Sequence, residues 1–135
     1  MLKKILCISG KPGLFKLISQ GKNMHVVESL IDAKRIPVYS QDKVISLSDI
    51  AIYTSSEEVP LTDILTIIKE KESGQKIDIK LFAQPESLKK YFLEILPEFD
   101  KDRVYPSDIK KILNWYNILM DAGITKFKEE KNQEN

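Results

Sequence analysis

The chain contains one cysteine and one histidine, side chains that often act as nucleophile and general base in enzymes. Cys7 stands between Leu6 and Ile8, where a small apolar core residue is expected. His25 lies in another apolar run, and the sequence shows no evident nucleophile for it to activate. We therefore predict that the protein has no catalytic residues and is not an enzyme.

The sequence also lacks the ligand spacings of metal and nucleotide sites. A single His and a single Cys cannot build a structural zinc site. The run Asp100-Lys101-Asp102 is similar to the start of a calcium loop, but Val104 fills the next ligand position and Tyr105 replaces the turn glycine. The glycines match neither a P-loop nor a dinucleotide-binding pattern. We expect no metal and no cofactor.

Basic and aromatic side chains are the remaining candidates for binding. Residues 1–56 hold eight Lys or Arg against four Asp or Glu, whereas residues 57–135 hold 13 against 16. Small β-barrels bind single-stranded nucleic acid through backbone charge and base stacking on aromatic rings. Scattered lysines are also typical of any solvated barrel surface, so the two interpretations stay open. The candidate partner-binding residues in this half are Lys11, Lys16, Lys34, Arg35, Tyr39 and Tyr53.

Length and composition place these residues in a small folded protein. The 135 residues are 42% hydrophobic and 30% charged, which is ordinary for one domain or two small ones. One cysteine cannot form an internal disulfide. The first apolar run is too short for a signal peptide, and no stretch approaches the ~20 residues of a membrane span. We predict a cytoplasmic protein that does not enter the membrane.

Short β-branched runs separated by turn residues indicate strands in the N-terminal half. About five or six such runs with tight connections are typical of a meander that closes into a small barrel. Met24 to Ile31 is the longest run, and both of its faces are partly apolar, which indicates packing on both sides. The last run is Ile50 to Thr54. Pro37 has no amide hydrogen, so its strand is expected at a sheet edge or a bulge.

In the C-terminal half the apolar residues recur at helical spacing. Three helices are expected to begin near Pro60, Pro85 and Pro106, because proline suits the first helical turn. Residues 75–82 alternate briefly and are interpreted as an extended connector or a further strand. From residue 126 the chain is nearly all polar and is expected to be frayed or disordered.

The third predicted helix carries more apolar surface than a single core would cover. One continuous face is apolar, and Trp115 and Ile118 fall on a separate sector. Either the helix is sandwiched between the barrel and the other helices, or this sector is offered to a partner. Trp115 and Ile118 are therefore candidate partner-binding residues, and a homodimer that buries them is the alternative structural role.

Several segments carry a resemblance to a known family. The resemblance covers nearly the whole chain and is strongest in ISGKPGLFKLIS at residues 8–19, VESL at 27–30, VISLSDIAIYT at 44–54 and LPEFDKDRVY at 96–105, with SDIKK and WYNIL following in the last helix. These segments resemble the uncharacterised Bacteroidota family known as domain of unknown function 5606. The resemblance implies an N-terminal SH3-like barrel joined to a C-terminal helical domain. It implies no activity, substrate, cofactor or functional residue.

The sequence thus predicts an α+β protein in three parts. An SH3-like β-barrel of about five strands spans residues 1–56, a three-helix region spans 57–125, and a disordered polar tail spans 126–135. The predicted function is that of a non-catalytic binding or adaptor module for an unknown protein or for nucleic acid, bound through the basic barrel. The alternative is a homodimeric structural protein that uses the Trp115/Ile118 helix face.

Overall fold

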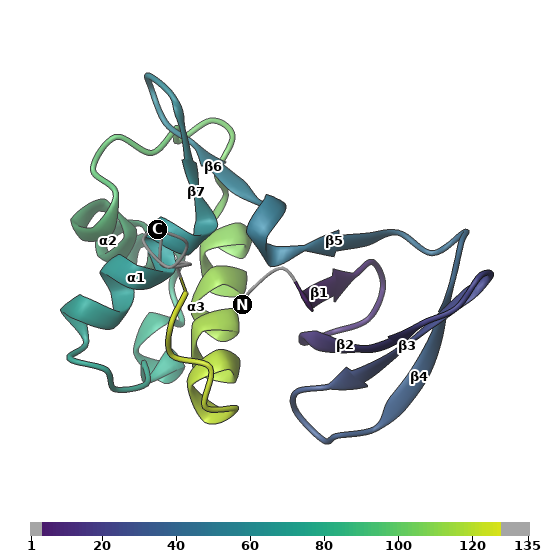
Figure 1. The fold of residues 1–135 in the computed structure, drawn as a ribbon. Coiled ribbons are helices and arrows are strands. Elements are labelled where there is room, and N and C mark those ends of the chain that lie inside the picture. The colour runs from purple at the N-terminus through teal and green to yellow at the C-terminus, as the bar shows by residue number, and fades with distance from the viewer. Residues whose placement is uncertain (1–3, 128–135) are drawn as a thin grey trace, which may run out of the picture.

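The computed structural model describes residues 4–127 and confirms the α+β class. An antiparallel sheet forms the N-terminal part and three helices form most of the C-terminal part, with helix α3 (Pro106–Asp121) standing between the sheet and the other two helices (Figure 1). The sheet has the strand order β4-β3-β2-β1-β5. Its strands are β1 (Ile5–Ile8), β2 (Phe15–Gln20), β3 (Met24–Ser29), β4 (Arg35–Tyr39) and β5 (Val44–Ser46).

The sheet is open, with β4 and β5 as its two edges, where the sequence analysis expected a closed barrel. The outer side of β4 explains why it gains no further strand. The amide of Tyr39 donates to the Asp42 carboxylate at 2.8 Å, so it points away from β3. Pro37, two residues earlier, turns its hydrogen-free nitrogen to the same outer side. The prediction that Pro37 marks an edge strand is therefore confirmed.

Alternate residues of the sheet pack into two different cores. On β1, Ile5 and Cys7 face the helices, whereas Leu6 and Ile8 face the opposite side. We call the first side the helix face and the second the inner face. The inner face has its own small core, which gathers one buried residue from each of four strands. These residues are Ile8, Phe15, Val27 and Val38.

The predicted last strand of the barrel belongs to a separate hairpin. β6 (Ala51–Tyr53) pairs with β7 (Glu58–Pro60) and not with the five-stranded sheet. A 3-10 turn, η2 (Leu47–Asp49), redirects the chain after β5, and its Leu47 is fully buried in the main core beside the helices. Ile52 joins the same core from β6. The placement of this run in the barrel was thus wrong, because its apolar side chains pack against the helices.

The three helices begin where the prolines predict. Helix α1 (Leu61–Lys71) follows Pro60, and helices α2 (Pro85–Ile95) and α3 start at their prolines. Together with Ile5 and Leu14 from the sheet region they enclose one large apolar core. Trp115 on α3 is 7% exposed and lies in this core. The sandwiched position of the third helix, one of the two arrangements expected for it, is therefore confirmed.

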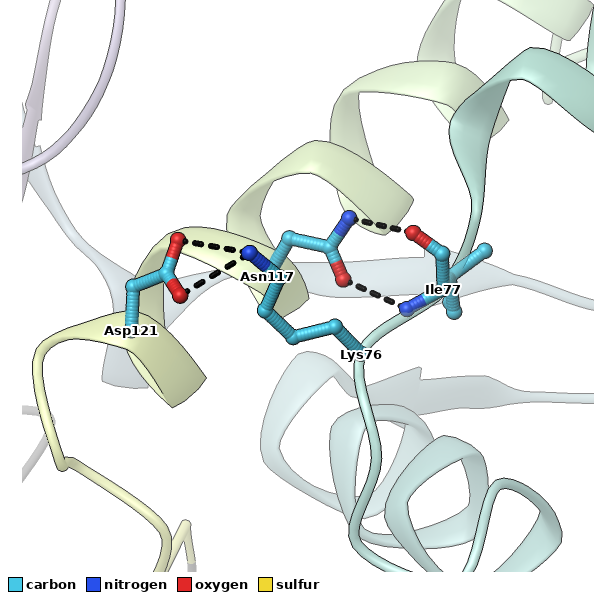
Figure 2. A network of polar contacts seen from close by, with 4 residues as sticks. All are labelled: Lys76, Ile77, Asn117 and Asp121. Atoms are coloured by element: carbon cyan, nitrogen blue, oxygen red, sulfur yellow. Dashed lines mark hydrogen bonds and ion pairs between the residues drawn. The ribbon is translucent and has the colours of Figure 1, made fainter.

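The segment between α1 and α2 is a connector tied to α3 by side chains. It runs extended from residue 75 and closes with a short 3-10 helix, η3 (Ile79–Phe82). The Asn117 side-chain amide bonds both backbone groups of Ile77, accepting from the N–H and donating to the C=O, each at 2.8 Å (Figure 2). Lys76 donates to the Asp121 carboxylate one helical turn further, at 3.0 Å.

The expectation for the polar tail is wrong at its start. Phe127 is 4% exposed and packs against the Tyr116 ring, with the ring centroids 6.2 Å apart. Its large apolar surface is better buried than exposed, although its neighbours in sequence are polar. The rest of the predicted tail, residues 128–135, lies outside the described residues.

Candidate functional site

Cys7 and His25 are too far apart to act together. Cys7 lies on β1 and His25 on β3, with β2 between them, so their strands are about 9–10 Å apart. Cys7 packs on the helix face. His25 lies two residues before Val27 on β3, so both side chains are on the inner face. Burial raises the pKa of the Cys7 thiol above its ordinary value, and the nearby Lys111 ammonium offsets part of that rise. The thiol therefore stays protonated at neutral pH and is a poor nucleophile.

The acidic residues do not gather into a metal-binding cluster in residues 4–127. No group of three or more His, Cys, Asp or Glu side chains is arranged to hold an ion there. The Asp100 carboxylate accepts from the Asp102 amide at 2.9 Å and lies 3.5 Å from Arg103, so it orders its own loop.

No helix among the described residues is long and apolar enough to cross a membrane.

A basic hollow lies between the sheet and α3. We call it the junction groove. Its volume is about 460 Å³. One wall is the end of β1 with the loop 9–13, and the other is the first three turns of α3. The side chains that give it chemical character are Lys11, Ser107, Lys110, Lys111, Asn114 and Trp115.

The junction groove is positively charged without compensation from its own walls. Lys11, Lys110 and Lys111 line it, and no carboxylate residue does. All three lysines are exposed, and none forms an ion pair with a carboxylate of residues 4–127. Like charges gathered at a concave surface raise the local concentration of anions. The groove is therefore suited to a ligand with several negative charges.

The residues that line the junction groove are positioned by one face of α3 and by a tight loop. Ser107, Lys111, Asn114 and Ile118 follow one another at four, three and four residues, so they share one face of α3. The opposite loop turns sharply at Gly10 and Gly13, whose φ angles are +84° and +86°. A Cβ on Gly13 would lie 2.7 Å from the Ile31 side chain. The positive φ angle favours glycine at position 13, whereas the exposed end of the Ile31 side chain could move aside.

A second hollow of about 220 Å³ adjoins the first and shares Lys111 and Trp115 with it. We call it the aromatic hollow. Its walls are mostly apolar and come from β6, from residues 103–104 and from α3. Tyr53 stands at its rim, 42% exposed, with the Arg103 guanidinium carbon 4.8 Å from the ring centroid. Guanidinium groups stack on aromatic faces in this way.

Four of the eight residues proposed from the sequence lie at these two hollows. Lys11, Trp115 and Ile118 line the junction groove, and Tyr53 and Trp115 line the aromatic hollow. Tyr53 is exposed, whereas Trp115 contributes as a buried wall. The basic N-terminal half and the Trp115 helix, which the sequence offered as two candidates, therefore meet at one place.

The other four proposed residues lie elsewhere. Lys16 and Arg35 flank Glu28 across three neighbouring strands, and Arg35 is ion-paired with Glu28 at 3.1 Å. The backbone amide of Lys34 donates a hydrogen bond to the Asp32 carboxylate in the turn between β3 and β4. Tyr39, 46% exposed, borders a third hollow of about 240 Å³ on the inner face, where His25 also lies. None of the four lines the junction groove or the aromatic hollow.

Sequence reasoning missed the cations that α3 and its preceding loop contribute. Lys110, Lys111 and Arg103 were not among the candidates, because the basic surface was sought only in the N-terminal half. A signal for them was present. Lys110 and Asn114 form a polar strip next to Trp115 on the helix, and that strip faces the junction groove.

Comparison with known families assigns both halves of the chain. The model of domain of unknown function DUF6852 matches residues 50–119, which is more than half of the chain. The chain belongs to the DUF6852 family. The model of domain of unknown function DUF5606 matches residues 2–47, which confirms the resemblance noted in the sequence. The two matches meet at η2, the turn that leads from the five-stranded sheet to the DUF6852 part.

A solved structure shares this arrangement. The solution NMR structure of a protein from Bacteroides vulgatus is 56% identical, with a TM-score of 0.75. The match covers 94% of this chain and 91% of that one. No curated protein matches the chain at a significant level. The descriptions of DUF6852 and DUF5606 name no ligand, so function has to be argued from the two hollows themselves.

Proposed function

We propose that the protein is a non-catalytic module that binds nucleic acid in the junction groove. The observation that carries this proposal is the set of three exposed lysines around one hollow that no carboxylate lines. Phosphate groups on a nucleic-acid backbone are regularly spaced anions that such lysines can bind together. Ser107 and Asn114 add neutral hydrogen-bond donors to the same wall.

The alternative of a homodimer through the Trp115/Ile118 face gains no support from the geometry. Trp115 is 7% exposed and Ile118 is partly buried against the same core. A stable interface needs roughly 800 Å² from each partner, centred on well-packed exposed anchors. The sector that suggested self-association packs within one chain instead.

We also propose a cytoplasmic location, because the lone cysteine requires no oxidising compartment.

The test is the salt dependence of binding to a fluorescein-labelled single-stranded RNA of about 12 nucleotides. Each backbone contact contributes about −0.7 to the slope of log affinity against log salt, so three lysines predict a slope of about −2. Affinity should fall roughly 20-fold between about 50 and 200 mM salt. In the Lys110→Gln/Lys111→Gln variant the slope should fall to about −0.7.

The matched control changes another pair of consecutive exposed lysines. Lys89 and Lys90 lie on α2 and line neither hollow. The Lys89→Gln/Lys90→Gln variant removes the same net charge and should keep the original slope. Equal losses in the two double variants would show that only net charge matters. That result, or the absence of binding by the unmodified protein, would overturn the proposal.

A further inference from the structure

The two hollows at α3 differ in chemistry although they share Lys111 and Trp115. The junction groove is lined by lysines and small polar groups, as a backbone of phosphates requires. The aromatic hollow is lined mainly by apolar side chains, with one exposed tyrosine at its rim. The apolar and aromatic lining residues are Ile50, Ala51, Ile52, Tyr53, Val104, Ile112 and Trp115.

Resting on the proposed function, we infer that the ligand is single-stranded RNA or DNA and that one unstacked base enters the aromatic hollow beside Tyr53. The phosphates on one side of that base then lie along the junction groove at Lys111. A base offers two flat apolar faces and a polar edge, which matches an apolar hollow with an aromatic rim. In a duplex these faces are stacked on one another, so they cannot enter the aromatic hollow.

Contacts within the chain hold the backbone at the rim of the aromatic hollow. The Asp100 amide donates to the Tyr53 carbonyl at 2.9 Å, which attaches the loop before α3 to β6. Asp100 also lies 3.5 Å from Arg103, whose guanidinium covers the Tyr53 ring. Tyrosine and arginine planes both stack on bases. Backbone that is already held in place loses less entropy when a ligand binds.

The carboxylate in this hollow does not oppose a base. Asp108 lines it, and one of its oxygens accepts from the Tyr105 amide at 3.0 Å as part of the helix cap. Arg103 and Lys111 line the same hollow, so cations outnumber the carboxylate there. A base carries no charge at neutral pH, and carboxylate oxygens accept hydrogen bonds from exocyclic amino groups.

Trp115 supplies the readout, because it is the only tryptophan of the chain and lines both hollows. Its fluorescence should be quenched as unlabelled RNA is added. Three RNAs of one sequence are compared at constant salt: a single strand, its duplex, and a single strand with abasic sites at its centre. The single strand should bind about tenfold more tightly than the other two, within the range for one base stacked on an aromatic ring.

Tyr53→Leu keeps an apolar side chain but removes the aromatic face. This variant should lose about tenfold in affinity for the intact single strand and lose little for the abasic strand, with the salt slope unchanged. Tyr39→Leu is the matched control, since Tyr39 is similarly exposed but borders the hollow on the inner face. It should bind all three RNAs as the unmodified protein does.

The outcomes separate this inference from the proposed function. Equal binding of single strand, duplex and abasic strand, with no effect of Tyr53→Leu, would overturn the base-binding hollow and leave the basic groove standing. No binding of any RNA would overturn both. The abasic comparison uses the unmodified protein, so it holds even if Tyr53→Leu folds poorly.

Discussion

Replacing Asn117 by alanine should destabilise the protein far more than its position near the helix surface suggests. The side chain makes two hydrogen bonds to the backbone of Ile77, each 2.8 Å long and partly buried. Each such bond contributes about 1 kcal/mol net, so the loss is about 2 kcal/mol. Unfolding entropy is about 2.1 cal/mol/K per residue, or roughly 0.28 kcal/mol/K for 135 residues. The melting temperature should therefore fall by about 7 °C.

The neighbouring ion pair gives the control for this measurement. Lys76 and Asp121 pair at 3.0 Å, but both side chains are more than half exposed. An exposed pair is worth about 0–1 kcal/mol, so Lys76→Ala should lower the melting temperature by at most about 4 °C. Both variants are compared by calorimetry at the same pH and salt. A drop of under 2 °C for Asn117→Ala, or a larger drop for Lys76→Ala, would refute the view that Asn117 fastens the connector to α3.

Three further predictions concern the core and its titratable groups. Trp115→Ala should cost ~3–5 kcal/mol in urea unfolding, because it removes a buried indole, and an unchanged midpoint would contradict its place in the core. Burial and the hydrogen bond to Glu72 raise the pKa of Tyr91 above its ordinary value near 10. The unfolded chain then releases this proton at lower pH than the folded one, so stability should fall as pH rises above 10, and less steeply in Tyr91→Phe. If stability fell more steeply with pH in Tyr91→Phe than in the unmodified protein, the raised pKa of Tyr91 would be contradicted. Because burial raises its pKa, Cys7 should react with a disulfide reagent more slowly in the folded protein than in urea at pH 7.5, and equal rates would contradict a protonated, packed thiol.

Local signals in the sequence were sufficient for the elements that proline and periodicity define. Pro106 set the start of α3, and Pro37 marked the edge of the sheet, because both effects depend only on the ring and the missing N–H. The apolar sector at Trp115 correctly indicated a helix packed on two sides. These features are properties of a single segment, and they hold whatever the rest of the chain does.

Features that depend on pairing between distant segments were not predictable in the same way. The run that became β6 has the alternation of a barrel strand, and only its partner β7 and the buried Ile52 show that it belongs with the helices. Phe127 stands in a polar stretch, so its contact with Tyr116 has no local signature. One aromatic residue among charges is a weak signal until the surface it covers is known.

The candidate site was likewise predictable only for residues whose type was informative by itself. Residue types pointed to Lys11 and Tyr53, but their neighbours come from α3, about 60 or more residues further along the chain. Counting charge by segment concealed the site, because the C-terminal half is acidic on balance although α3 carries Lys110 and Lys111. Arg35 and Lys16 are equally basic in sequence, yet they surround Glu28 and offer little uncompensated charge.

Backbone amide shifts of the 15N-labelled protein, measured while a single-stranded RNA is added, test the central claim most directly. Binding in the junction groove predicts that the largest shifts cluster in the loop 9–13, at residues 103–104 and along the first three turns of α3, which are the walls of the two hollows. Residues 35–39 on the far edge of the sheet should stay unmoved. Shifts confined to that edge, or none at saturating RNA, would contradict the account.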